Sequence, residues 1–240
     1  MKAVFTGGGT GGHLYPAIAI ADALGSRAKV RFIGTADRLE MTIVPKAGYA
    51  LSTITSRPLI RKPSLEMALT AGANVAGILQ AARVLGEMDP DIVIATGGYV
   101  CFPVMAAAKM LRAAGRLRAP LALLEPNAHP GLTNRMLAPI VDEVWGAFAD
   151  SHGAFGAKYV RTGIPVRASL LRRSNRIEAA RRLGLDPNRR TILAMGGSQG
   201  ARSLNETVAA LVVRRALPVD WQLLHVSGRR DYDYMKAEER

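Results

Sequence analysis

The architecture can be inferred from a glycine-rich stretch near the start of the chain, Val4-Phe5-Thr6-Gly7-Gly8-Gly9-Thr10-Gly11-Gly12-His13-Leu14-Tyr15-Pro16. The apolar run Ala3 to Phe5 predicts a buried strand, and Tyr15 to Gly25 predicts a helix. Glycine permits sharp turns and close approach of the backbone to a ligand, because it has no Cβ. The unpaired N–H groups that open a helix favour anions. This strand–loop–helix unit is therefore expected to bind a phosphate or diphosphate, with Gly8 and Gly9 in the loop.

The same unit occurs twice more along the chain. A strand pattern at Asp91 to Ala95 precedes Gly97-Gly98-Tyr99, and one at Thr191 to Met195 precedes Gly196-Gly197-Ser198-Gln199-Gly200. A helix pattern follows each loop. One such loop is a weak signal, whereas three loops, each between a strand and a helix, indicate a phosphate-rich ligand.

Strand and helix patterns alternate over most of the sequence. Further strands are expected at Lys29 to Gly34, Ala50 to Thr55, Pro120 to Glu125, Val141 to Phe148 and Lys158 to Thr162. This alternation predicts an α/β fold with a doubly wound parallel sheet that binds ligands at the carboxyl ends of its strands. Because Gly163 to Arg167 looks like a linker, we expect one domain over residues 1–163 and part of a second over 164–240. The second has one strand–helix–strand unit, too little to bury both faces of a parallel sheet, so it is expected to be incomplete.

Charge and composition restrict the class of partner. Lys and Arg exceed Asp and Glu by 32 − 19 = 13, which favours nucleic acid, an anionic membrane or an anionic substrate. Aromatic residues make up only 5% of the chain and the arginines are scattered, so we expect no nucleic acid. Cys101 is the single cysteine, which excludes a disulfide framework and fits a reducing, cytoplasmic setting. The histidines are dispersed, and no metal site is expected.

Two segments bear on membrane contact. The helix expected from Ser64 to about Met88 has a charge-free stretch, Met67 to Ala82, that falls short of the roughly 17 apolar residues needed to cross a bilayer. We therefore expect no transmembrane helix. The loop Arg57 to Lys62 is basic with an apolar centre, so it could rest on anionic lipid headgroups, or it could be an ordinary solvated loop.

Two residues are candidate general bases. His13 lies at an expected helix start, where the positive end of the helix dipole favours the neutral imidazole that can accept a proton from a hydroxyl. Its alternative role is to close the turn or to bind a phosphate. Glu125 ends a buried strand at the same edge of the sheet, and its alternative role is to orient a loop by accepting N–H bonds. The sequence leaves both choices open.

Six motifs in order carry a family resemblance: Gly8 to His13, Gly34 to Glu40, Gly97 to Val100, Glu125 to Asn127, Pro130 to Arg135 and Gly196 to Ala201. Together they resemble the MurG family, the bacterial N-acetylglucosaminyltransferases that make lipid II for peptidoglycan. The resemblance implies two Rossmann-like domains of the glycosyltransferase B type. The N-terminal domain would receive lipid I, an undecaprenyl-diphosphate-linked muramyl pentapeptide, and the second would hold UDP-N-acetylglucosamine.

The resemblance also implies a reaction and a place in the cell. N-acetylglucosamine would move to the C4 hydroxyl of the muramyl sugar with inversion at the anomeric carbon, without a cofactor. The enzyme would be peripheral, on the cytoplasmic side of the inner membrane, in contact with its anionic surface. The family's later uridine- and sugar-recognition segment would lie beyond Arg240, so a truncated chain that binds the donor poorly by itself is expected.

Individual residues match the family's site positions. Thr10, Gly11 and Gly12 lie where the family lines its sugar-nucleotide and acceptor-diphosphate site, and Asn127 matches a sugar-contacting asparagine. Arg167 and Ser198 match donor-binding positions, while His13 and Glu125 match residues discussed as catalytic or acceptor-positioning. The family commonly reads His-Glu-Gln-Asn where this chain has Leu124-Glu125-Pro126-Asn127, so two polar groups are lost near the acceptor.

Two other functions fit parts of the sequence. The first loop, with Gly7, Gly9 and Gly12 at fingerprint spacing and Asp37 further on, also fits an oxidoreductase that binds a nucleotide cofactor. Absorbance of a bound cofactor would reveal that class of enzyme. The other alternative is a non-catalytic fragment that binds lipid-linked diphosphate, which would retain lipid I without transferring sugar.

Overall fold

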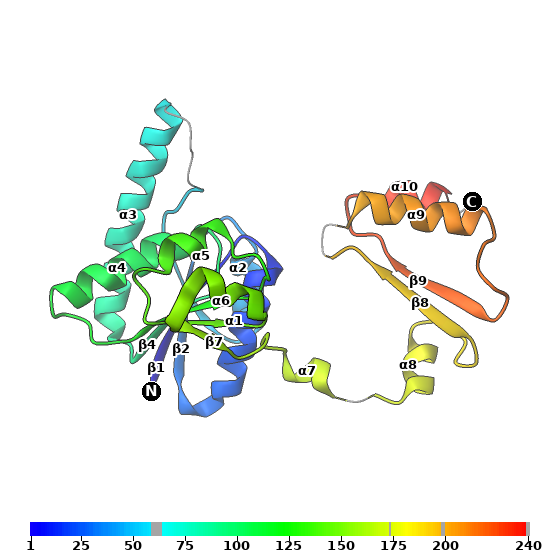
Figure 1. Cartoon of the computed structure of the whole chain (residues 1–240), viewed down its shortest axis with the longest axis horizontal. Helices are drawn as coiled ribbons and strands as arrows, with labels where there is room; N and C mark the ends of the chain where they lie inside the picture. Colours follow the sequence, from blue (N-terminus) through cyan, green and yellow to red (C-terminus); the bar gives the residue numbers. More distant parts are fainter. Residues whose placement is uncertain (59–63, 173, 198–199, 239–240) are drawn as a thin grey trace. The chain divides into compact units, whose positions relative to one another are not determined.

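The computed structural model describes residues 1–58, 64–172, 174–197 and 200–238 (Figure 1). The chain forms two compact units, Met1–Leu171 and Arg172–Arg240. The expected boundary after Gly163 lies shortly before the end of the first unit, ahead of the short helix α7 (Ala168–Leu171). The two units are described separately below.

The first unit is built on a seven-stranded sheet in the order β3-β2-β1-β4-β5-β6-β7, and every neighbouring pair is parallel. The strands are β1 (Lys2–Thr6), β2 (Lys29–Gly34), β3 (Ala50–Thr53), β4 (Ile92–Ala95), β5 (Leu121–Glu125), β6 (Glu143–Gly146) and β7 (Tyr159–Arg161). The strand order reverses direction between β1 and β4. Ligands of doubly wound sheets bind outside the carboxyl ends of the strands at such a switch point. The predicted α/β class and doubly wound sheet are confirmed.

Helices cover both faces of this sheet. They are α1 (Gly11–Leu24), α2 (Glu40–Lys46), α3 (Leu65–Met88), α4 (Cys101–Ala113), α5 (Leu132–Leu137) and α6 (His152–Phe155). One core cluster includes Leu85 of α3 and Val104 of α4, and a second includes Leu14 of α1 and Val44 of α2. Because both faces are covered, the central strands are apolar throughout rather than alternating.

Helix α3 has two different faces. At its start the Ser64 hydroxyl accepts a hydrogen bond from the Met67 N–H at 3.2 Å and so caps the helix. Thr70, Asn74, Gly77, Ala81, Leu85 and Met88 form its buried face. Among the described residues α3 is the one helix long and apolar enough to cross a bilayer by length and composition. Its C-terminal half, with Ala81 and Leu85, nevertheless packs into the core of the first unit.

The second unit contains α8 (Arg176–Arg182), β8 (Arg190–Met195), α9 (Arg202–Val213), β9 (Trp221–Val226) and α10 (Tyr232–Glu238). Strands β8 and β9 pair in parallel. Its described buried apolar side chains are few and include Val208, whereas Leu193 and Met195 of β8 are 57% and 60% exposed. This exposure agrees with the expectation that one strand–helix–strand unit cannot bury both faces of a sheet.

Cys101, at the start of α4, ties the second glycine loop to β1. Its single S–H is shared between the Thr6 carbonyl oxygen, 3.3 Å from Sγ, and that of Gly97, 3.1 Å from Sγ. Burial raises the pKa of the Cys101 thiol to about 12. A group whose pKa rises on folding stabilises the folded protein while the group is protonated. This contribution is lost as the pH rises above the pKa that the thiol has in the unfolded chain.

Comparison with a Cys101→Ala variant isolates the thiol from other groups that titrate at high pH. Between pH 7 and pH 10 we expect the free energy of unfolding of the wild type to fall by about 1 kcal/mol more than that of Cys101→Ala. Urea unfolding of both proteins at the two pH values measures this shift. A difference that stays constant with pH would show that the thiol ionises as freely in the folded protein as in the unfolded chain.

Candidate functional site

The first two glycine loops interlock at the carboxyl ends of β1 and β4. The Gly8 N–H donates to the Gly97 carbonyl oxygen at 3.3 Å. A Cβ on Gly98 would lie 2.5 Å from the Gly8 carbonyl oxygen, and Gly98 also has a φ of +91°. A Cβ on Gly7 would lie 2.1 Å from the Thr96 Oγ1. Only glycine fits these contacts, so the two loops form one surface at the switch point.

His13 lies in the first turn of α1 and contacts both loops. Its Nδ1 is 3.1 Å from the Gly8 carbonyl oxygen and 3.4 Å from the Thr10 Oγ1. A carbonyl oxygen only accepts, so this contact assigns the hydrogen to Nδ1 and leaves Nε2 of the neutral ring as an acceptor. The ring also lies against Gly97, where a Cβ would be 3.0 Å from Nε2. His13 therefore lies against both loops, and its role as a base stays a prediction.

The N–H groups of the first loop are not equally free. The Gly8 N–H is used by Gly97, and the Gly9 N–H donates to the Glu40 Oε2 at 3.3 Å. Within the described residues, the N–H groups of Gly11 and Gly12 at the start of α1 have no protein acceptor. The N–H groups at the helix start, where the dipole also favours an anion, are therefore available to a ligand, and a phosphate contact with this loop stays a prediction.

Glu40 supports the first glycine loop by accepting a hydrogen bond from it, although the sequence indicated no role for Glu40. It is 1% exposed, and its Oε1 accepts from the Thr35 N–H at 3.1 Å and from the Thr35 hydroxyl at 2.8 Å. A Cβ on Gly8 would lie 2.5 Å from that oxygen. The available signal was an acidic residue shortly after Gly34-Thr35, at the strand edge where the glycine loops also lie.

Glu125 ends β5 and is fully buried. Its Oε1 accepts from the backbone N–H and the Nδ2 of Asn127, both at 2.9 Å. Its Oε2 accepts from the Gly131 N–H at 3.0 Å and the Asn134 Nδ2 at 2.9 Å. A carboxylate has about four acceptor positions, and four N–H donors fill them here. This geometry is that of a carboxylate that orients its loop.

The neighbours of Glu125 follow from this network. Asn127 is exposed, but its Nδ2 is held by Glu125 and its carbonyl oxygen accepts from the Ser151 hydroxyl at 3.1 Å. Leu124, one of the two departures from the family pattern, is buried in β5. Pro126, the other, is half-buried in the loop. A contact between Asn127 and a sugar stays a prediction.

Arg167 lies close to the start of α1. Its guanidinium carbon is 4.3 Å from the centre of the Tyr15 ring, a cation–π distance. That ring lies 3.0 Å from the position a Cβ would take on Gly11. Tyr15 and Arg167 also line a cavity of about 320 Å³ with Lys46. Only the Tyr15 ring therefore separates the Arg167 guanidinium from the start of α1. A contact of Arg167 with a donor diphosphate stays a prediction.

The third glycine loop lies in the second unit, between β8 and α9, and includes Gly196 and Gly197. Ser198 and Gln199, both predicted site residues, lie outside the described residues. Gly200 has a φ of +76°, and a Cβ there would be 2.0 Å from the Ser227 carbonyl oxygen. Glycine is therefore required where this loop passes the end of β9.

Asn205 of α9 fixes that end of the second unit. It is fully buried, and its Nδ2 donates to the Ser227 carbonyl oxygen and to Asp231 Oδ2, both at 2.9 Å. Its Oδ1 therefore accepts from the His225 Nε2 at 2.9 Å. A cavity of about 480 Å³ lined by Gly197, His225 and other residues adjoins the loop.

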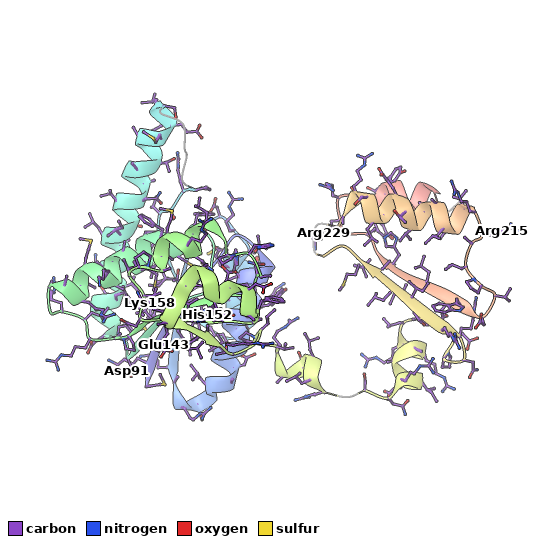
Figure 2. All side chains as sticks on the ribbon, in the orientation of Figure 1. Asp91, Glu143, His152, Lys158, Arg215 and Arg229 are labelled. Carbon is purple, nitrogen blue, oxygen red and sulfur yellow. The ribbon has the colours of Figure 1, made fainter. Side chains whose placement is uncertain are left out.

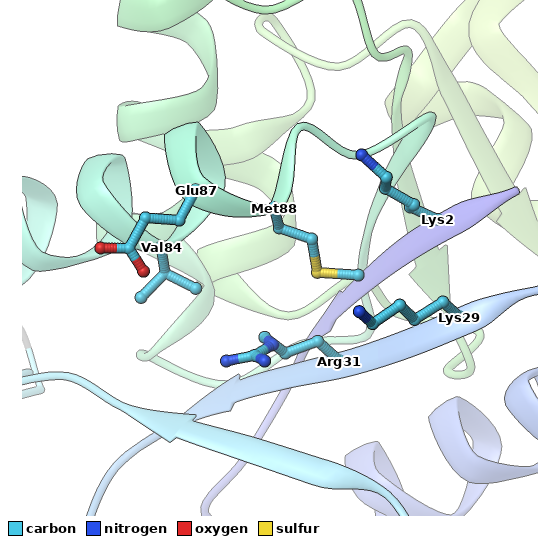
Figure 3. Close-up of a pocket in the computed structure, with 6 residues that line it drawn as sticks. All are labelled: Lys2, Lys29, Arg31, Val84, Glu87 and Met88. Atoms are coloured by element: carbon cyan, nitrogen blue, oxygen red, sulfur yellow. The ribbon is translucent and has the colours of Figure 1, made fainter.

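Three further observations concern residues outside the candidate site. Basic side chains are spread along the chain, and Arg215 and Arg229 lie near opposite ends of α9 (Figure 2). The described residues contain no group of three or more His, Cys, Asp or Glu that could hold a metal ion. A cavity of about 160 Å³ is lined by Lys2, Lys29 and Arg31 with residues of α3 (Figure 3). It lies where β1 and β2 begin, away from the glycine loops.

The chain is similar to known glycosyltransferases. Residues 3–145 match the model of the glycosyltransferase family 28 N-terminal domain. A relative from Desulforamulus reducens is 39% identical over 243 residues, covering 99% of this chain and 63% of the relative. One from Ruminiclostridium cellulolyticum is 40% identical over 240 residues, covering 97% of this chain and 63% of the relative. Both are named UDP-N-acetylglucosamine–N-acetylmuramyl-(pentapeptide) pyrophosphoryl-undecaprenol N-acetylglucosamine transferase.

Solved structures share the fold. Acinetobacter baumannii MurG has a TM-score of 0.68 at 24% identity, covering 99% of this chain and 62% of that one. Anabaena HepE in complex with UDP has a TM-score of 0.63 at 17% identity, covering 99% and 64%. The chain spans about 63% of the length of the curated relatives. The chain belongs to glycosyltransferase family 28, and its resemblance to MurG, expected from six sequence motifs, is confirmed.

Proposed function

We propose that the chain contributes the acceptor-binding domain and part of the donor-binding domain of an inverting N-acetylglucosaminyltransferase. The enzyme moves N-acetylglucosamine from UDP-N-acetylglucosamine to the C4 hydroxyl of the muramyl sugar of lipid I, giving lipid II for peptidoglycan. The names of the relatives support this substrate pair. The observation that carries the proposal is the interlocked surface formed by Gly8, Gly97 and Gly98 beside the free N–H groups of α1.

The acceptor diphosphate binds at the start of α1. The N–H groups of Gly11 and Gly12 and the positive end of the helix dipole stabilise its charge. Nε2 of His13 accepts the proton of the C4 hydroxyl as that oxygen attacks the anomeric carbon from the face opposite the leaving group. The bond to UDP breaks as the new glycosidic bond forms, and UDP leaves with the electron pair.

Charge that develops on UDP needs stabilisation in the transition state. The N–H groups at the start of α9 suit this role. Glu125 orients Asn127 through the contacts between them. In this mechanism His13 is the base and Glu125 is a positioning residue.

A non-catalytic fragment that binds lipid-linked diphosphate is the second candidate function. The exposed Leu193 and Met195 of β8 favour it, because a donor domain with an uncovered sheet face is a poor platform for catalysis. Retention of lipid I without sugar transfer would support this candidate. A nucleotide-cofactor oxidoreductase is disfavoured, because the first glycine loop lies within the segment that matches the glycosyltransferase family.

The loop surface can be tested with Gly98→Ala. The new Cβ would clash with the Gly8 carbonyl oxygen at a backbone conformation that alanine adopts poorly, so we expect the affinity for diphosphate to fall at least tenfold. Titration calorimetry with inorganic diphosphate measures the change. Gly72→Ala is the control, because Gly72 is an exposed helix residue with open space around it. Wild-type affinity in a folded Gly98→Ala protein would remove the loops from the site.

We also propose that the protein is peripheral on the cytoplasmic face of the membrane. Leu65, Leu69, Val75 and Leu79 are exposed and, at 100° per residue, lie within about 120° of one another on α3. An exposed apolar stripe on a strongly basic chain suits an anionic lipid surface. The predicted basic loop Arg57 to Lys62 lies mostly outside the described residues, since 59–63 are not described.

Vesicle binding tests this surface. The double substitution Leu69→Ser with Leu79→Ser is expected to lower binding to vesicles of anionic phospholipid by about 30- to 1,000-fold, because each leucine contributes about 1–2 kcal/mol on insertion. Co-sedimentation against neutral vesicles separates the charge contribution. Val219→Ser is the control, because Val219 is 95% exposed in the second unit. Equal losses for both proteins would argue against a specific surface on α3.

A further inference from the structure

A cavity beside the second glycine loop has no role in the mechanism above. It has a volume of about 190 Å³. Its lining includes Arg57, Asn74 of α3, Tyr99, Phe102 of α4, and Leu132 and Met136 of α5. The walls therefore come from four segments far apart in the sequence.

One wall is held by a buried amide. Asn74 is 5% exposed, and its Oδ1 accepts from the Arg57 N–H and the Ser56 hydroxyl, both at 3.1 Å. Its Nδ2 donates to the Arg57 carbonyl oxygen at 3.1 Å. Close by, a Cβ on Gly77 would lie 2.0 Å from the Thr55 carbonyl oxygen, so the chain runs directly against α3. These contacts fix the segment that carries Arg57 and hold the cavity open.

Tyr99 connects the cavity to the glycine loops. It belongs to the second loop and lines the cavity. Its ring also lies 3.8 Å from the position a Cβ would take on Gly9 in the first loop. A ligand whose diphosphate is bound beside these loops can therefore extend past Tyr99 into the cavity.

The chemistry of the cavity suits an apolar fragment. Phe102, Leu132 and Met136 supply apolar walls, and the amide of Asn74 already bonds the backbone. The volume is below the roughly 300–1,000 Å³ of pockets that hold whole small molecules. A sugar or a peptide would turn many of its polar groups toward Phe102, Leu132 and Met136, whereas a branched hydrocarbon packs against this wall without needing hydrogen bonds. The positive charge of Arg57 suits a neighbouring phosphate.

We propose that this cavity receives the first isoprene units of a polyprenyl diphosphate, the part of the acceptor nearest its diphosphate. The inference rests on the proposed function, because it takes the acceptor diphosphate to be bound at the glycine loops. The cavity would add specificity, because the protein would recognise the prenyl chain of the acceptor as well as its diphosphate. The relatives' names include pyrophosphoryl-undecaprenol, whose chain has this chemistry.

Three soluble probes separate the contributions: inorganic diphosphate, methyl diphosphate and geranyl diphosphate. We expect geranyl diphosphate to bind wild type about tenfold or more tightly than methyl diphosphate, because several carbons leave water in the cavity. Met136→Ser should remove most of this gain and leave the affinity for methyl diphosphate unchanged. Met136 is 43% exposed, so the variant is expected to fold. Met110→Ser is the matched control, a methionine on α4 that is 59% exposed and not part of the cavity lining.

The outcomes distinguish the two levels of the proposal. If wild type binds neither methyl nor inorganic diphosphate, the loops are not a diphosphate site and the proposed function fails. If it binds both but gains nothing from the geranyl chain, only the isoprenoid cavity is overturned. A gain that survives Met136→Ser, or that Met110→Ser removes equally, overturns it as well. Loss of the gain in Met136→Ser alone supports it.

Discussion

Replacing His13 with glutamine is expected to lower the turnover of sugar transfer by about 10²- to 10⁴-fold, the usual contribution of a general base. The glutamine amide can still donate to the Gly8 carbonyl oxygen, as the Nδ1 of His13 does at 3.1 Å, so the loop should keep its shape. It cannot accept a proton. Binding of inorganic diphosphate should therefore stay near the wild-type value while transfer is lost.

Transfer of labelled N-acetylglucosamine from UDP-N-acetylglucosamine to a soluble lipid I analogue measures this effect. Because the chain spans about 63% of its relatives, the equivalent change is also made in the full-length Ruminiclostridium cellulolyticum protein. A variant that binds diphosphate and transfers sugar at the normal rate would reduce His13 to a residue that closes the turn.

Features set by local sequence could be predicted from the chain. Each glycine loop follows a strand and precedes a helix, as the apolar runs and glycine spacing indicate. The cap at Ser64 also follows from residues within one turn of the helix. These signals are local, because a strand, a tight turn and a helix start are each specified by a few adjacent side chains.

Features that depend on strand pairing could not be predicted. The contact between Gly8 and Gly97 exists because β1 pairs with β4, for example through the Thr96 N–H and the Thr6 carbonyl oxygen. No local pattern brings together residues about ninety positions apart in the sequence. Glu40 was missed for the same reason, since its oxygens accept from Thr35 and from Gly9 across two neighbouring strand ends.

Helices and strands begin or end at unexpected residues where backbone N–H groups form hydrogen bonds with side chains instead. Helix α2 begins only at Glu40, because the preceding turn wraps around the Glu40 carboxylate. The predicted strand Ala50 to Thr55 ends at Thr53. Beyond it the Thr55 N–H donates to the Gln80 Oε1 at 2.6 Å, so the chain leaves the sheet for α3.

The second large effect is expected for Glu125→Gln, which should destabilise the first unit by about 3 kcal/mol. The four N–H donors that face Glu125 require an acceptor on both of its oxygens. A glutamine amide keeps one oxygen and turns an NH₂ group toward two of the donors, leaving buried donors without a partner. For a unit of this size the expected fall in the midpoint of thermal unfolding is about 6–12 °C.

Glu143→Gln on the next strand is the matched control. Glu143 is exposed and accepts one hydrogen bond, from the Trp145 Nε1 at 2.8 Å, so its loss should cost less than about 0.5 kcal/mol. Thermal unfolding of both variants, together with transfer activity per folded molecule, separates the two roles left open for Glu125. A positioning carboxylate predicts a large loss of stability with part of the activity retained. A Glu125→Gln protein as stable as wild type but without activity would make Glu125 the base, because the amide would then have replaced only the proton acceptor.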